Sequence, residues 1–178
     1  EVKRSISVGD VIVTDGDFLN FKESCVSKAF DNRVGCYIVL EVMKKLKSKR
    51  LDVEVVALGS AQEEVGIRGA WAAGVDQRPD MGIALDVTAA FDVPGVSPDQ
   101  QVTKLGGGIA IKINDQATIS NHGIVKKFTQ LAKSAKINYQ YEVLPFGGTD
   151  AAGFQRSGAA VCTLSVPTRY VHSPNEMI

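Results

Sequence analysis

The amino-acid sequence predicts an α/β protein, a three-layer α/β/α sandwich with a largely parallel mixed sheet. From about residue 24 onward, apolar segments of strand length alternate with segments of helical periodicity. Several strand segments are continuous runs of β-branched residues, which is typical of strands covered on both faces. The 178 residues are enough for one domain with a sizeable core, and neither an internal repeat nor a low-complexity linker divides them.

The first half of the chain carries two predicted helices and one predicted central strand. Residues 1–22 predict only short β segments, around "VGDVIVTD". Residues 34–46 are apolar nearly all round, so we expect a buried helix, and the basic residues that follow suit its negative C-terminal end. Residues 53–59 are a β-branched run and predict a central strand. Residues 65–74 predict a short helix that ends at Gly74, because glycine is favoured just past a helix C-terminus.

The second half continues the alternation. We expect a helix over residues 122–135, and strands over residues 80–88, 106–114, 139–145 and 159–167. The apolar residues that form one stripe of this helix are Ile124, Phe128, Leu131 and Ala135. The three glycines of "LGGGIA" predict a bend that enters a strand; they do not form a nucleotide-binding loop, because no Lys-Ser/Thr pair follows them.

The charge balance and the cysteines exclude several classes of protein. Lys+Arg 20 equals Asp+Glu 20, so we expect no nucleic-acid partner, and no apolar run has the length of a membrane span. A net charge near zero favours self-association, although weakly. Cys25, Cys36 and Cys162 are odd in number and lack CxxC spacing, which indicates reduced, mostly buried thiols of a cytoplasmic protein.

Acidic residues follow several predicted strands, at the edge of the sheet where ligands of α/β proteins bind. Taken singly they have ordinary explanations, since Asp31 could cap a helix and Glu63 could face a helix dipole. Taken together, several carboxylates at one edge would repel one another unless a cation lay between them, and carboxylate with imidazole is a donor set for divalent metals. The polar residues concerned are Asp31, Glu63, Glu64, Asp86, Asp150 and His172.

A two-metal hydrolase site would use all of these groups. In such sites one carboxylate bridges two ions, others bind one ion each, and an acid that binds no metal accepts a proton from the attacking water. Glu63 and Glu64 are neighbours and point in different directions. One of them can therefore face a metal while the other faces the water and the substrate.

Five motifs occur in a distinctive order and spacing: "KAFDNRVG", "AQEEVGIRGA", "ALDVT", "GGTDAAG" and "TRYVHSPNEMI". From about residue 24 to the end, the chain resembles the dinuclear metallo-aminopeptidases of the glutamyl and deblocking aminopeptidase family. The resemblance implies a zinc-peptidase-like fold and a cytoplasmic enzyme that removes N-terminal residues from peptides. It also implies two divalent metal ions per full-length subunit, zinc or cobalt, and a homo-oligomer in which dimers assemble into a tetrahedral dodecamer.

The resemblance also implies a role for each site residue. Asp31 would bridge the two metals, and Glu63 would be the general base for a metal-bridging hydroxide. Glu64 and His172 would bind one metal, and Asp86 the other. The segment that resembles the family's glycine-rich loop at the rim of the active site consists of Gly147, Gly148, Thr149 and Asp150. A tight turn explains that loop equally well.

The sequence departs from the family pattern at one metal ligand. The family takes an early histidine from a His-x-Asp motif, whereas this chain has only two histidines, and His122 lies at a predicted helix start where a surface position is expected. The resemblance further implies that residues 1–22 are the tail of a β-rich inserted dimerisation domain. Residues 23–178 would be the C-terminal part of the catalytic domain, incomplete at both ends. We therefore expect residues 1–178 alone to be inactive.

Other activities remain open at this point. A metal-dependent deacylase of the same superfold would use the same water against other amides. An endoglucanase is disfavoured, because sugar-cleaving sites use aromatic platforms, while aromatic residues make up 7% of this chain and Trp71 lies in a predicted helix. A serine hydrolase would need a G-x-S-x-G elbow, which is missing. A subunit whose role is assembly is the non-enzymatic alternative.

Overall fold

The computed structural model describes residues 5–178 and contains a four-stranded mixed sheet at its centre. Its strand order is β3-β6-β4-β5; β3 is parallel to β6, β4 is parallel to β5, and β4 meets β6 antiparallel. The strands are β3 (Met81–Ala89), β4 (Ile109–Asn114), β5 (Tyr139–Val143) and β6 (Ala160–Thr168). Each lies close to the strand that the sequence predicts.

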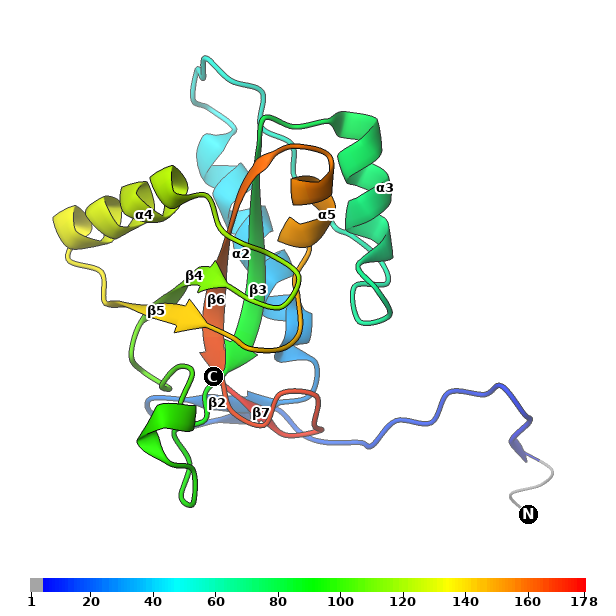
Figure 1. Cartoon of the computed structure of the whole chain (residues 1–178). Coiled ribbons are helices and arrows are strands. Elements are labelled where there is room, and N and C mark those ends of the chain that lie inside the picture. Colours follow the sequence, from blue (N-terminus) through cyan, green and yellow to red (C-terminus); the bar gives the residue numbers. More distant parts are fainter. Residues whose placement is uncertain (1–4) are drawn as a thin grey trace.

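Helices cover both faces of this sheet. α4 (His122–Ala135) packs on the face that carries Ile111 and Cys162, whereas α5 (Ala151–Arg156) packs on the face that carries Ala84 and Val161. Val161 and Cys162 are neighbours on β6, and successive strand residues point to opposite faces. α3 (Arg68–Gln77) packs against α5, on the opposite side from α4 (Figure 1). The predicted three-layer α/β/α sandwich is therefore confirmed.

A small antiparallel sheet joins the first and last parts of the described chain. Its order is β1-β2-β7, with β1 (Leu19–Asn20), β2 (Cys25–Ser27) and β7 (Glu176–Met177). Cys25 and Ile178 exchange two backbone hydrogen bonds of 2.8 and 3.0 Å. The sheet therefore fixes the segment before α2 (Phe30–Leu46) beside the segment that follows β6.

The β segments predicted over residues 1–22 are mostly wrong. Residues 1–4 lie outside the described residues, and only Leu19–Asn20 forms a strand. Residues 10–14 form an exposed segment without secondary structure that extends away from the rest of the molecule (Figure 1, blue), whereas Asp15 pairs with Lys28 and the ring centroid of Phe18 lies 6.4 Å from that of Phe30. An extended chain pairs as a strand only where a neighbouring strand offers backbone partners.

The bounds of α4 are predicted correctly, but its buried face is rotated from the predicted stripe. Asn121 caps the helix, because its side-chain oxygen accepts from two backbone N–H groups of the first turn. Leu131 is 48% exposed and Ala135 is also exposed. Thr129 takes a buried position because its hydroxyl donates to the Val125 carbonyl oxygen at 2.9 Å. The buried residues of the helix are Ile124, Val125, Thr129 and Ala132.

Two elements predicted to be buried are exposed within residues 5–178. Residues 53–59 run extended without forming a strand, and Val53 and Val56 are 69% and 58% exposed. α2 packs on β3, but Tyr37 and Leu40 on its other side are exposed. Both predictions are wrong here, because a β-branched run becomes a central strand only when strands pair with it, and the described sheet ends at β3. None of the helices in this part of the chain is both long and apolar enough to cross a membrane.

Gly74 has a packing role in place of the predicted helix-ending role. α3 runs on to Gln77, so Gly74 lies inside the helix and is buried. A Cβ atom at this position would lie 2.8 Å from the carbonyl oxygen of Gly153 in α5. The glycine therefore allows α3 and α5 to approach closely.

The cysteine prediction holds in part. All three are free thiols, and Cys162 is buried in the core between α4 and the sheet. Cys25 is half-buried and Cys36 is exposed on α2. The exposure of Cys36 follows from that of the outer side of α2.

Candidate functional site

One cavity of about 780 Å³ opens at the carboxyl ends of β3 and β6. These two strands are parallel, so the segments that follow them meet at the same edge of the sheet. All five residues predicted to bind metal or to act as the base line the cavity: Asp31, Glu63, Glu64, Asp86 and His172. His122 is exposed at the start of α4 and lies outside it, so its predicted surface position is confirmed.

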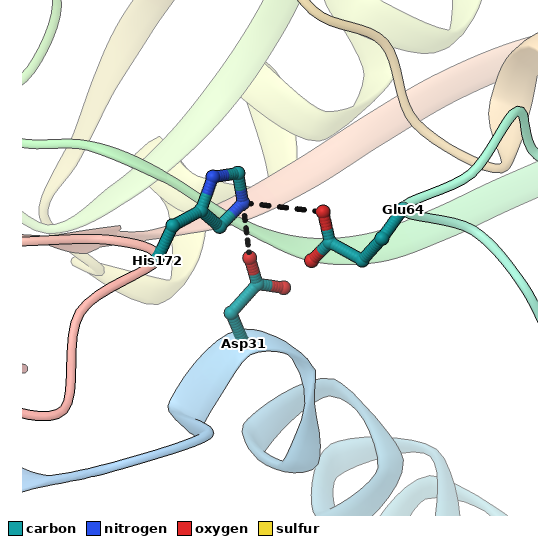
Figure 2. A group of neighbouring side chains, drawn as sticks. All are labelled: Asp31, Glu64 and His172. Atoms are coloured by element: carbon teal, nitrogen blue, oxygen red, sulfur yellow. Dashed lines mark ion pairs between the residues drawn. The ribbon is translucent and has the colours of Figure 1, made fainter. Parts of the chain in front are cut away.

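Three of these residues converge on one point (Figure 2). His172 Nε2 lies 3.1 Å from Asp31 Oδ2 and 3.3 Å from Glu64 Oε2. One donor atom from each residue lies within 4.8 Å of the others. The side chains come from the start of α2, the loop before α3 and the loop after β6. Two carboxylate oxygens and an imidazole nitrogen are a donor set that suits a divalent transition metal.

The ordinary explanations for these acids do not describe the structure. Asp31 is not the residue that caps α2, because the N-cap position is Ala29. Glu63 and Glu64 precede α3, and the first turn of α3 contains no acidic residue. Capping of α2 and a position in the first turn of α3 therefore do not account for these acids, which line the cavity.

A buried carboxylate that the sequence did not point to holds the cluster together. Glu176 on β7 accepts from the backbone N–H of Asp31 at 2.9 Å and from that of His172 at 3.0 Å. Its two oxygens therefore orient two segments that lie far apart in the chain. The available signal was an acid directly before the apolar residues Met177 and Ile178, since a buried carboxylate requires partners.

Asn32 fixes the start of α2 to the central sheet. Its Nδ2 donates to the Leu85 carbonyl oxygen at 2.8 Å, and its Oδ1 accepts from the Gly35 backbone N–H at 3.0 Å. Gly35 lies so close that an added Cβ would be 2.3 Å from Asn32 Oδ1. Asp31 is therefore held beside the strand that carries Asp86.

Burial makes the carboxylates of the cavity resist ionisation. Burial, followed by the negative charge of Asp150, raises the pKa of Glu63 to about 7. Burial, followed by the charge of Glu64, raises the pKa of Asp31 to about 6. Burial also raises the pKa of Asp86 to about 8, although the Val87 backbone N–H donates to this carboxyl. A cation among these groups would favour their charged forms, so the donor set fits divalent metal binding.

The loop between β5 and α5 forms one wall of the cavity. Gly147, Gly148 and Thr149 line it, and Gly147 has a positive φ of 71°. Thr149 is buried, with its hydroxyl 2.8 Å from that of Thr163. Asp150 accepts from the Ser60 hydroxyl, and burial raises the pKa of this carboxyl. A tight turn accounts for the glycine geometry, and Thr149 and Asp150 have partners within the fold.

A buried lysine also lines the cavity and was not singled out from the sequence. Lys112 Nζ lies 2.7 Å from Glu142 Oε1 and 3.1 Å from Asp115 Oδ2, and all three side chains are buried. Glu142 also accepts from the hydroxyls of Thr88 at 2.8 Å and Ser165 at 2.7 Å. The available signal was a lysine at an alternating position of the apolar strand "IAIKIN".

A carboxylate–histidine cluster at the carboxyl ends of parallel strands, in an α/β/α sandwich, is typical of zinc-peptidase-like hydrolases. The comparison with known families is more specific. The model of the M42 glutamyl aminopeptidase family matches residues 1–178, and the chain belongs to this family.

Relatives and solved structures agree with this membership. A candidate aminopeptidase of Acetivibrio thermocellus is 38% identical over 178 residues, which are 99% of this chain and 53% of the relative. The structure of aminopeptidase APDkam598 from the archaeon Desulfurococcus kamchatkensis superposes with a TM-score of 0.91 at 38% identity, over 99% of this chain and 50% of that one. The TET1 peptidase of Pyrococcus horikoshii, described as assembling into a tetrahedron or a large octahedral shell, superposes with a TM-score of 0.80 at 29% identity, over 91% and 47%. The chain spans about half the length of the curated relatives it matches.

Proposed function

We propose that the protein carrying this chain is a metal-dependent aminopeptidase that hydrolyses N-terminal residues from peptides. Asp31, Glu64, Asp86 and His172 are its metal ligands, and Glu63 is its general base. The observation that carries the proposal is the convergence of Asp31, Glu64 and His172 on one point in an acidic cavity of a fold shared with aminopeptidases.

The donor set supports two divalent ions, zinc or cobalt, and Asp31 would contribute a ligand to both. Asp31, Glu64 and His172 provide three protein ligands, the number that catalytic zinc sites use. Asp86 lines the same cavity but lies outside this group of three, which supports its assignment to a second ion. When bound, such ions polarise the scissile carbonyl and lower the pKa of a water molecule.

Glu63 is suited to accept and return a proton. It lines the cavity next to Glu64 but is not one of the three converging groups. Burial raises its pKa to about 7, and a general base works best with a pKa near the working pH. Its carboxylate takes a proton from the attacking water and passes it to the leaving amine.

The second ion lacks a histidine among the described residues. His122 is the other histidine of the chain, and it is exposed on α4 outside the cavity. Asp31 and Asp86 alone hold a transition metal weakly. Residues 1–178 by themselves therefore bind at most one ion tightly and have little or no peptidase activity.

The domain and assembly assignments belong to the same proposal. Residues 1–22 are the tail of a β-rich dimerisation domain and residues 23–178 belong to the catalytic domain. The exposed segment of residues 10–14 supports this division. The partners are peptide substrates and further copies of the full-length protein, which form dimers that assemble into a dodecamer in the cytoplasm. The shells described for the Pyrococcus horikoshii relative support that assembly.

The test is hydrolysis by the full-length protein. Free N-terminal amino acids should be released from unblocked peptides, the activity should disappear with a chelator, and zinc or cobalt should restore it. A peptide with an acetylated N-terminus is the matched control substrate. Release of acetate from that control without attack on unblocked peptides would favour a deacylase and contradict the proposal.

A further inference from the structure

We infer that the cavity selects substrates whose N-terminal side chain is uncharged and apolar, although the family name refers to glutamyl residues. This inference rests on the proposed aminopeptidase function. It treats the part of the cavity beyond the acidic cluster (Asp31, Glu63, Glu64 and Asp86) as the site of the substrate side chain. It follows from three features: the apolar residues of the cavity wall, the pairing of Lys112 with two buried carboxylates, and the ion pair between Arg169 and Asp92 that holds the wall in place.

The wall beyond the acidic cluster is apolar and partly open. Phe91, after β3, and Phe146, after β5, lie with ring centroids 6.2 Å apart. Val93 and Leu144 line the same wall, and Tyr170 lies beside it with its side chain exposed. Exposed aromatic side chains beside a cavity leave apolar area for a ligand to cover.

Lys112 does not make this wall suitable for an acidic side chain. Among the described residues that line the cavity it is the one charged group besides the acidic cluster and His172. Its ammonium is already paired with Glu142 and Asp115, at 2.7 and 3.1 Å. A substrate glutamate would therefore meet a cation whose charge is offset by two carboxylates. A substrate lysine would find no carboxylate among the described lining residues beyond those assigned to metal binding and proton transfer.

A bidentate ion pair holds the wall in shape. Arg169 Nε and Nη2 donate to the two carboxylate oxygens of Asp92 at 2.8 and 2.9 Å. Asp92 lies between Phe91 and Val93, and Arg169 precedes Tyr170 in the segment that leads to His172. The apolar wall is thus fixed to the loop that carries a metal ligand, so the pocket is formed before substrate binds.

The cost of burying an unpaired charge sets the expected selectivity. Moving a charged side chain into an apolar wall removes its hydration without offering a partner, whereas a leucine side chain gains from burial. We expect kcat/KM for leucine p-nitroanilide to exceed the values for the glutamate and lysine p-nitroanilides by a factor on the order of 100.

The experiment compares these three substrates with the zinc-loaded full-length protein. Calorimetric binding of free L-leucine and L-glutamate gives a second readout, which does not require turnover. Preference for glutamate or lysine in either measurement would overturn the inference. Failure to hydrolyse any of the amides while L-leucine binds more tightly than L-glutamate would contradict the proposed function and leave the pocket assignment standing.

A cation placed in the wall should change the selectivity. Val93→Lys, at a half-buried position, should lower the leucine-to-glutamate ratio of kcat/KM by about 10-fold, because a new ammonium provides the missing partner. Val75→Lys, on the exposed side of α3, is the matched control and should leave the ratio unchanged. An unchanged ratio in Val93→Lys would show that the substrate side chain does not reach this wall.

Discussion

Replacement of Lys112 by methionine should destabilise the protein strongly, because it leaves Glu142 and Asp115 buried without their cation. Removing one partner of a buried ion pair costs about 3–5 kcal/mol. The remaining carboxylates keep other donors: Glu142 accepts from two hydroxyls, and Asp115 accepts from the backbone N–H groups of Ala117 and Thr118 at 2.9 and 2.7 Å. We therefore expect the lower end of the range, about 3 kcal/mol.

The predicted loss can be measured as a change in melting temperature. For a protein of this size, each kcal/mol corresponds to about 2–4 °C, so Lys112→Met should melt about 6–12 °C lower than the parent. Burial opposes the charge on Lys112, but the charges and hydrogen bonds of Glu142 and Asp115 together outweigh it and raise the pKa of Lys112 above the usual value. A raised pKa means that the stabilisation is fully present below the unfolded pKa of 10.5 and is lost as the pH rises through the folded pKa. Scanning calorimetry of the metal-free protein at pH 7 therefore measures the full effect.

Two further variants make the test specific. Lys126→Met changes an exposed lysine of α4 and should leave the melting temperature within about 2 °C of the parent. Adding Glu142→Gln to Lys112→Met should recover part of the loss, because it removes one buried charge. The amide oxygen can accept from one of the hydroxyls of Thr88 and Ser165, and the amide N–H can donate to the other. Equal melting temperatures for Lys112→Met and Lys126→Met would refute the buried ion network. A further loss in the double variant would refute the charge argument.

Three further predictions concern the metal site. In the full-length enzyme, Glu63→Gln should keep its metals and lose about two to four orders of magnitude in turnover, whereas Glu64→Gln should lose metal affinity first; full metal occupancy in Glu64→Gln would mean that the two roles are reversed. Asp31→Ala should weaken both metal sites and Asp86→Ala mainly one, as measured by metal titration; indistinguishable losses would contradict a bridging Asp31. Calorimetry of residues 1–178 with zinc should reveal one tight site, and two tight sites or peptide cleavage by this chain would contradict the proposed shortage of ligands.

The sequence predicts the fold and the members of the site where local pattern and chemistry agree. The strands that end near Asp86 and His172 have continuous apolar runs, and parallel strands bring their carboxyl ends together. The convergence of Asp31, Glu64 and His172 could therefore be anticipated from residue type and position. The same logic finds the α4 helix, whose capping residue Asn121 and apolar period are both local signals.

The errors arise where partners decide the outcome. Residues 53–59 have the composition of a buried strand, but composition does not say whether another strand pairs with them, and none does within the described sheet. Glu176 and Lys112 were missed because a buried charge is recognised by what surrounds it. Their partners lie far along the chain: Glu176 holds Asp31 across 145 positions. Such pairs have no signature at any fixed spacing.

The hydrogen bond between Glu176 and the backbone of Asp31 can form only after both residues have been synthesised, so it has an earliest time during synthesis. A chain made at about 5–20 residues per second needs roughly 7–30 seconds to extend from Asp31 to Glu176, a separation of 145 residues. His172, the only nitrogen donor of the cluster, is made just before Glu176. During that interval the nascent chain contains Asp31 and Glu64. It still lacks Glu176, which orients Asp31, and His172, which supplies the imidazole of the cluster. Metal binding by this cluster is therefore possible only once His172 has been made, and by then β6, which joins β3 to β4 in the central sheet, has been made as well.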